Sequence, residues 1–149
     1  MKALSIAAPG NAEYRELAQP TPAADEVLMR VRYVGYCGSD LTTYRGLNPL
    51  VSYPRIPGHE VSGVVSAVGA GVGPGIRPGM AALVIPYTSC GACPSCRAGR
   101  ANCCVSNQTL GVQRDGALAE WLVAPAAKVI VAPALGLRAL AMVEPLTIG

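Results

Sequence analysis

Cysteine is the first residue type in this 149-residue chain whose spacing could do chemistry. Five of the six cysteines fall within the stretch "SCGACPSCRAGRANCC", residues 89–104. The sixth, Cys37, and the single histidine, His59, lie far upstream. Thiolates and imidazoles are ligands that zinc favours in proteins. Two questions follow: what the cluster binds, and whether Cys37 and His59 belong to a second site.

The spacing of the clustered cysteines predicts a closed metal site. Cys90, Cys93 and Cys96 are separated by two residues each, and Cys104 follows after seven more. Two residues between thiolates let both face one ion from a tight turn, and four thiolates complete a tetrahedral zinc site with no open position. On spacing alone, Cys103 competes with Cys104 for the fourth position.

Three other interpretations of the cluster fit less well. A bacterial-type iron–sulfur run places its fourth cysteine after three residues and before a proline, not after seven residues. A disulfide framework is typical of shorter secreted domains with little apolar core, whereas 51% of this chain is hydrophobic. A redox-active Cys-x-x-Cys pair belongs beside a βαβ pattern, which this sequence lacks. We therefore predict a structural zinc ion.

The composition indicates one globular domain. Charged residues make up 14% of the chain, and the formal net charge of +3 comes from 12 basic residues that are scattered along it. Without a basic stripe, no nucleic-acid partner is predicted. No stretch reaches ~18 uncharged apolar residues, so no membrane span is predicted. The apolar run near the N-terminus is short for a secretory signal, and we expect a cytoplasmic protein.

Short apolar runs separated by Gly- and Pro-rich joints predict a mainly β fold, built as a small barrel or sandwich. The expected strands are 2–8, 26–34, 60–72, 81–86, 117–125 and 128–133. Residues 39–46 are expected to form a short helix that begins at Ser39 and ends at Gly46, and residues 136–144 a second one. The glycine run at 69–75 does not match G-x-G-x-x-G, so we predict a turn there rather than a dinucleotide loop.

Five motifs follow one another along the chain: "GYCGSDLTTYRG", "YPRIPGHEVSGVV", the cysteine cluster, "DGALAEWLVAP" and "VEPLTIG". Together they closely resemble the zinc-containing medium-chain alcohol and polyol dehydrogenases, in particular the sorbitol, threonine and sugar-acid dehydrogenases. The resemblance covers essentially the whole chain. It implies that residues 1–149 form a GroES-like β-barrel catalytic domain with short helices and a zinc-binding lobe at 89–105. It also implies a Rossmann domain, absent from this chain, that binds NAD or NADP.

The resemblance implies two zinc ions per chain. It assigns the structural zinc to Cys90, Cys93, Cys96 and Cys104, which leaves Cys103 without a ligand role. It assigns the catalytic zinc to Cys37, His59 and Glu144. One thiolate, one imidazole and one carboxylate leave the fourth position of the ion open, as catalytic zinc requires.

Three further site residues come from the resemblance and its chemistry. Glu60 matches a glutamate beside the metal that can act as an alternate ligand, and Ser39 matches a hydroxyl that accepts the substrate proton. Asp40 is interpreted as the partner that fixes the tautomer of His59. The alternative for Asp40 is a carboxylate at a helix N-terminus.

The chain departs from the family pattern at three places. Thr42 stands where many relatives have a histidine of the proton relay, so Thr43 or water would serve instead. The segment 79–82 reads "GMAA" where relatives often have "GDRV", a change expected to affect packing. The chain stops at "EPLTIG", where the dinucleotide domain is expected to begin. We therefore expect it to be an N-terminal part that is inactive by itself.

The predicted activity is zinc- and NAD(P)-dependent oxidation of an alcohol, polyol or sugar-derived hydroxyl, in a homodimer or homotetramer. One alternative is a zinc-free quinone or enone reductase of the same superfamily, which the predicted ligands disfavour. The other is a non-catalytic zinc-binding module, which would not need an open second site. Residues 44–55 contain several polar side chains and are expected either to border the substrate cleft or to form a solvated loop.

Overall fold

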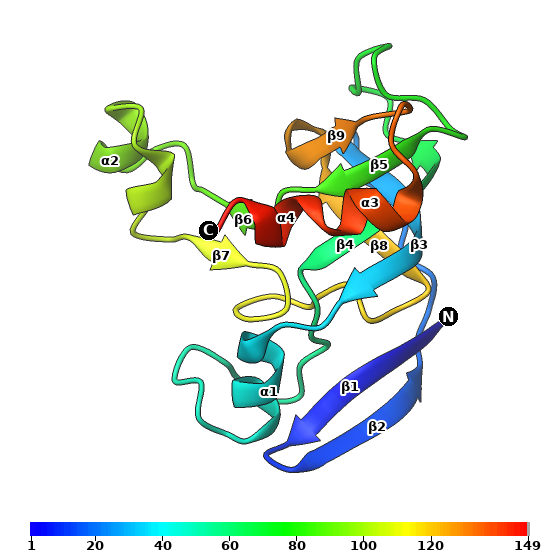
Figure 1. Cartoon of the computed structure of the whole chain (residues 1–149). Helices are drawn as coiled ribbons and strands as arrows, with labels where there is room; N and C mark the ends of the chain where they lie inside the picture. The colour runs from blue at the N-terminus through cyan, green and yellow to red at the C-terminus, as the bar shows by residue number, and fades with distance from the viewer. Residues whose placement is uncertain (149) are drawn as a thin grey trace.

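The computed structural model describes residues 1–148, in which strands outweigh helices (Figure 1). The strands are β1 Lys2–Ala8, β2 Asn11–Glu16, β3 Glu26–Gly35, β4 Glu60–Val68, β5 Ala81–Val84, β6 Tyr87–Thr88, β7 Gln108–Thr109, β8 Trp121–Pro125 and β9 Val129–Val131. The helices are α1 Gly38–Tyr44, α2 Pro94–Arg97, α3 Leu137–Ala141 and α4 Val143–Leu146, with short 3₁₀ turns η1 Ala101–Cys103 and η2 Ala126–Lys128. The mainly β prediction is confirmed.

A five-stranded antiparallel sheet forms the centre, in the order β8-β3-β4-β5-β9. One face carries the main core, in which Val27, Met29 and Val65 are almost fully buried. Helix α3 contacts β3, β4 and β5 and buries Leu140 completely. Because both faces are covered at its start, β3 buries Leu28 as well as Val27 and Met29. Beyond Met29, Arg30 and Arg32 are exposed and Val31 between them is half-buried, but Tyr33 is exposed again.

Two smaller units attach to this sheet. The hairpin β1–β2 joins through isolated bridges, Ala3 to Ala119 and Ile6 to Arg55. The ribbon β6–β7 leads to a lobe that holds α2 and η1, and this lobe stands away from the sheet (Figure 1). The cysteine cluster therefore lies outside the main core.

The predicted elements are largely present. Strand β1 has the predicted bounds, and α1 ends before Gly46 as expected, with Gly46 at a φ of 74° that favours glycine. The predicted start at Ser39 is wrong: α1 begins at Gly38, because Cys37 is the N-cap residue and forms a capping box with Asp40. The second expected helix is divided into α3 and α4, and the strand expected from residue 117 begins only at Trp121. Residues 69–75 form turns, as predicted. No helix within residues 1–148 is long and apolar enough to cross a membrane.

Candidate metal centres

The lobe brings the sulfur atoms of Cys90, Cys93, Cys96 and Cys104 within 4.8 Å of one another. The Sγ atoms of Cys90 and Cys104 lie 3.5 Å apart, near the edge of about 3.8 Å expected for a tetrahedron with zinc–sulfur bonds of ~2.3 Å. Backbone N–H groups of Cys90 and Ser106 donate to the Cys104 sulfur. Cys103 is exposed and outside this group.

The crowded thiols shift one another's proton affinities. Backbone N–H groups of Cys96 and Val105 lower the pKa of Cys93 to about 6. Burial, followed by hydrogen bonds from the Cys96 thiol to the Cys93 and Cys104 sulfurs, raises the pKa of Cys96 to about 12. Opposite shifts in one cluster mean that the four sulfurs cannot all carry charge unless a cation compensates them. This donor set fits a zinc ion.

A second cluster forms where β3 ends and β4 begins. These strands are antiparallel neighbours in which Gly35 pairs with Glu60, so Cys37 and His59 arrive at the same edge of the sheet. Ligand atoms of Cys37, His59 and Glu60 lie within 4.8 Å of one another. A Cβ at Gly35 would overlap the Glu60 carboxylate, so glycine is needed there for this carboxylate to reach the cluster.

Asp40 ties together the two segments that carry this cluster. Its carboxylate is 2% exposed and accepts hydrogen bonds from the backbone N–H groups of Cys37, at 2.9 Å, and Gly58, at 3.0 Å. Within residues 1–148 no hydrogen bond joins Asp40 to His59, whose Nδ1 has no protein partner there. The alternative, a carboxylate in the first turn of α1, is what the structure has.

Two buried polar atoms face this cluster without a protein partner in residues 1–148: the Ser39 hydroxyl and Nδ1 of His59. Both residues line a cavity of about 400 Å³ that also contains Cys37 and Glu60. Buried polar atoms normally have hydrogen-bond partners. Free polar atoms beside a thiol and two carboxylates suit a site that holds a metal and a ligand.

Glu144 lines the same cavity but lies outside the three-residue cluster. Its Oε1 accepts a hydrogen bond from the Tyr87 hydroxyl at 3.2 Å. Burial and then the Glu144 charge raise the pKa of Tyr87 above its usual value. Sequence reasoning missed Tyr87, because its contact with Glu144 joins β6 to α4 across 57 residues.

The relay candidates and the 44–55 loop lie away from this cavity. The Thr42 hydroxyl donates to the backbone carbonyl of Ser39, and Thr43 is buried. Arg55 pairs with Asp115 at 3.1 Å and donates to Ser52. None of these side chains lines the cavity around Cys37, so the loop uses its polar groups internally rather than bordering the cluster.

Comparison with known proteins identifies the family. The model for the alcohol dehydrogenase GroES-like domain matches residues 23–134. The chain belongs to this family. Among relatives of this GroES-like domain are an uncharacterized zinc-type alcohol dehydrogenase-like protein of Haemophilus influenzae, 42% identical, and L-galactonate-5-dehydrogenase of Escherichia coli, 34% identical. Each match covers 99% of the chain, and 44% and 43% of the respective relative.

A solved structure agrees with this assignment of the GroES-like domain. An alcohol dehydrogenase of Escherichia coli CFT073 (rspB), solved in complex with NADH, is 42% identical and superposes with a TM-score of 0.92. The match covers 99% of this chain and 43% of that one. The chain thus spans less than half the length of the relatives it matches.

Proposed function

We propose that this chain is the zinc- and substrate-binding part of an enzyme that oxidises a hydroxyl of a polyol or sugar derivative, with NAD or NADP as the hydride acceptor. The observation that carries the proposal is the cluster of Cys37, His59 and Glu60 in a cavity that also holds the Ser39 hydroxyl. Two relatives support the proposal: one is named for a sugar-acid substrate, and the structure of another contains NADH.

Cys37 and His59 would hold the catalytic zinc together with one carboxylate. The arrangement in the structure favours Glu60 as the third ligand, because its carboxylate lies in the cluster with Cys37 and His59, whereas Glu144 lies outside that cluster beside Tyr87. Glu144, which the family resemblance implied as the third ligand, would then be the alternate ligand. Either choice leaves one zinc position for a substrate oxygen.

When bound in such an open site, zinc supplies Lewis acidity that lowers the pKa of a coordinated hydroxyl. The residues of this chain would handle the proton. The Ser39 hydroxyl would take it from the substrate and pass its own proton to water; among residues 1–148, Ser39 Oγ has no hydrogen-bond partner that would compete. Asp40 keeps Cys37 and the backbone before His59 in place. The hydride transfer itself is the chemistry of the nicotinamide.

The four thiols of the lobe would hold a second zinc with a structural role, because four cysteine ligands leave no position for substrate. The dinucleotide would bind to a part of the enzyme beyond these residues. We expect the enzyme to act in the cytoplasm on small molecules and to assemble as a dimer or tetramer.

Metal analysis tests the proposal directly. Quantitative zinc determination on the purified chain should give two zinc ions per chain. One zinc ion would support a non-catalytic zinc module, and none would support a zinc-free reductase relative. The 149-residue chain alone should show no NAD-linked turnover, and measurable turnover would contradict its role as one part of the enzyme.

A further inference from the structure

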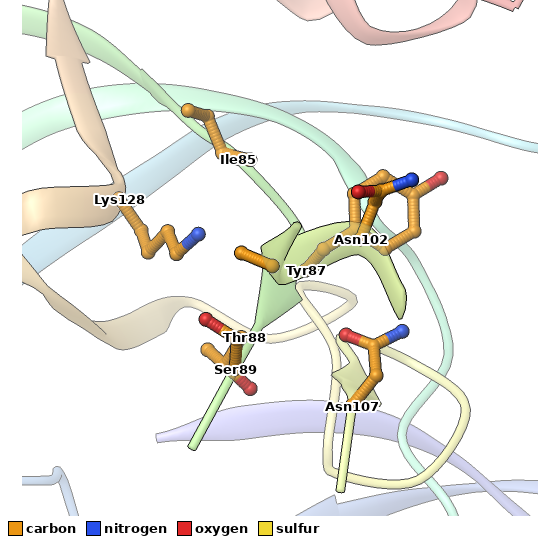
Figure 2. Close-up of a pocket in the computed structure, with 8 residues that line it drawn as sticks. Ile85, Tyr87, Thr88, Ser89, Asn102, Asn107 and Lys128 are labelled. Atoms are coloured by element: carbon orange, nitrogen blue, oxygen red, sulfur yellow. The ribbon is translucent and has the colours of Figure 1, made fainter. Parts of the chain in front are cut away.

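A second cavity lies next to Tyr87, beside the lobe. This cavity has a volume of about 370 Å³ and lies between the end of β5 and the lobe (Figure 2). Its lining comprises Ile85, Tyr87, Thr88, Ser89, Ala101, Asn102, Asn107 and Lys128. Tyr87 also lines the cavity around Cys37 and His59, so the two cavities share one wall. A molecule bound at the metal cluster would have to extend past Tyr87 to reach this second cavity.

The groups in the second cavity favour a negative charge. Lys128 lies on one side with its Nζ turned toward the open space, and Asn102 and Asn107 lie on the other (Figure 2). No carboxylate belongs to the lining, and Lys128 forms no salt bridge in the described part of the chain. An ammonium, amide N–H groups and a serine hydroxyl together supply several hydrogen-bond donors. An anion here would receive charge-assisted bonds that a neutral hydroxyl would not.

The chain's only other lysine provides a comparison. Lys2 lines a separate cavity in which Glu120 supplies a carboxylate. A carboxylate therefore shares the cavity of Lys2, where it accepts from the Lys2 backbone N–H, whereas no carboxylate lines the cavity of Lys128. Of the two lysines, Lys128 is therefore the one whose surroundings select for an external anion.

We propose that the cavity beyond Tyr87 is an anion subsite that binds the phosphate or carboxylate end of the substrate. This inference rests on the proposed function and narrows its substrate class to acidic sugar derivatives. The volume of about 370 Å³ is ample for a charged group with several carbons attached. Arg55, in the 44–55 loop, is another cation that could bind an anionic substrate end. It is paired with Asp115 and lines neither cavity, so Lys128 is the better candidate for anion binding.

The subsite also gives the lobe a part in substrate binding. Asn102 belongs to η1, within the segment that the four thiols hold together, and Asn107 lies three residues after the last of these thiols, Cys104. Lys128 is contributed by η2 at the edge of the sheet. The anion would therefore bridge the lobe and the sheet.

Nuclear magnetic resonance titration of the zinc-loaded chain tests the subsite without requiring turnover. The probes are inorganic phosphate, D-gluconate and the neutral polyol D-glucitol. The side-chain amide signals of Asn102 and Asn107 should shift with phosphate, with gluconate or with both, which also separates a phosphate end from a carboxylate end. Glucitol should leave these signals unchanged. Equal shifts with glucitol, or none with either anion, would overturn the proposal.

Matched lysine variants assign the effect to Lys128. Lys128→Gln should weaken anion binding about tenfold or more, Lys128→Arg should retain most of it, and Lys2→Gln should leave it unchanged. The fold should persist in Lys128→Gln, because Lys128 supports the sheet through its backbone carbonyl, which accepts from Ile85 N–H. Equal weakening of anion binding by Lys2→Gln would mean that only the overall charge of the protein matters, and this would contradict the subsite.

The outcomes separate this inference from the proposed function. Two zinc ions per chain without anion binding would leave the dehydrogenase proposal standing and remove the subsite. Anion binding at Lys128 without zinc at Cys37 and His59 would leave the anion site standing and contradict the dehydrogenase proposal.

Discussion

The two cysteine-containing clusters differ in how the chain assembles them. The four thiols of the lobe come from one continuous segment, residues 90–104, and three of the four are at least partly exposed. Cys37, His59 and Glu60 come from two segments that meet only because β3 pairs with β4, and His59 and Glu60 are buried. We therefore expect the lobe to depend on a bound metal for its order, and the second cluster to keep its shape through the pairing of β3 with β4.

Removal of one lobe ligand should have the largest effect. Cys90→Ser should eliminate one zinc ion per chain and the order of residues 89–105, because structural zinc sites contribute binding free energies of about 10–16 kcal/mol to folding in small zinc domains. Zinc analysis and amide hydrogen exchange across the lobe would measure this loss.

Cys103→Ser is the matched control for that experiment. It removes an adjacent, exposed thiol that lies outside the cluster. It should retain both zinc ions and the exchange protection of the lobe. Equal damage from both substitutions would mean that Cys103 shares in metal binding.

Removal of a ligand from the second cluster should affect function far more than folding. Cys37→Ala should leave one zinc ion per chain, held by the lobe, and abolish alcohol oxidation in the complete enzyme. The thermal midpoint should change by only a few degrees, since β3 and β4 hold the surrounding backbone. Loss of both zinc ions would show that the two clusters are not independent.

Asp40 should link stability to metal affinity in the second cluster alone. Asp40→Asn replaces one acceptor oxygen by an N–H₂ group facing a backbone N–H donor, and we expect a loss of about 1–3 kcal/mol in the free energy of unfolding. Zinc affinity at Cys37 and His59 should fall about 10–100-fold, as for other residues that position metal ligands. Urea unfolding and competitive zinc titration would measure both, and an equal loss at the lobe would contradict this assignment.

The same contrast explains what could be predicted from the sequence. The lobe cysteines form a local pattern, and the glycine that ends α1 is a local stop signal, so both were predictable. The start of α1 was misplaced, because Cys37 rather than Ser39 is its N-cap residue. Strand β2 was missed because all six of its residues are exposed and lack an apolar alternation. Strands β6 and β7 have only two residues each, too few to show a period.

Contacts between segments far apart in the chain could not be predicted from the sequence either. The contact of Tyr87 with Glu144 and the use of Asp40 by the backbone of Cys37 and Gly58 depend on how remote segments meet. Residue type could name Asp40 as important but could not tell which donors it would face. The second cavity could not be foreseen either, because its lining comes from β6, the lobe and η2.

The smallest expected effect concerns Tyr87, one of six tyrosines. Its pKa is raised first by burial and then by Glu144, so the folded protein should hold this phenolic proton to higher pH than an exposed tyrosine would. The resulting stability is present below the ordinary tyrosine pKa and is lost as the pH rises through the raised value.

Glu144→Gln removes the charge but leaves the burial, so it should lower the pKa of Tyr87 only part of the way toward its usual value. Absorbance titration at alkaline pH in the Cys37→Ala background, where only the lobe keeps zinc, would isolate this change, and Tyr87→Phe would identify the signal. An unchanged titration in Glu144→Gln would mean that the two side chains are apart in solution. Glu144 would then be free to join Cys37 and His59, and the case for Glu60 as the third ligand would lose its main support.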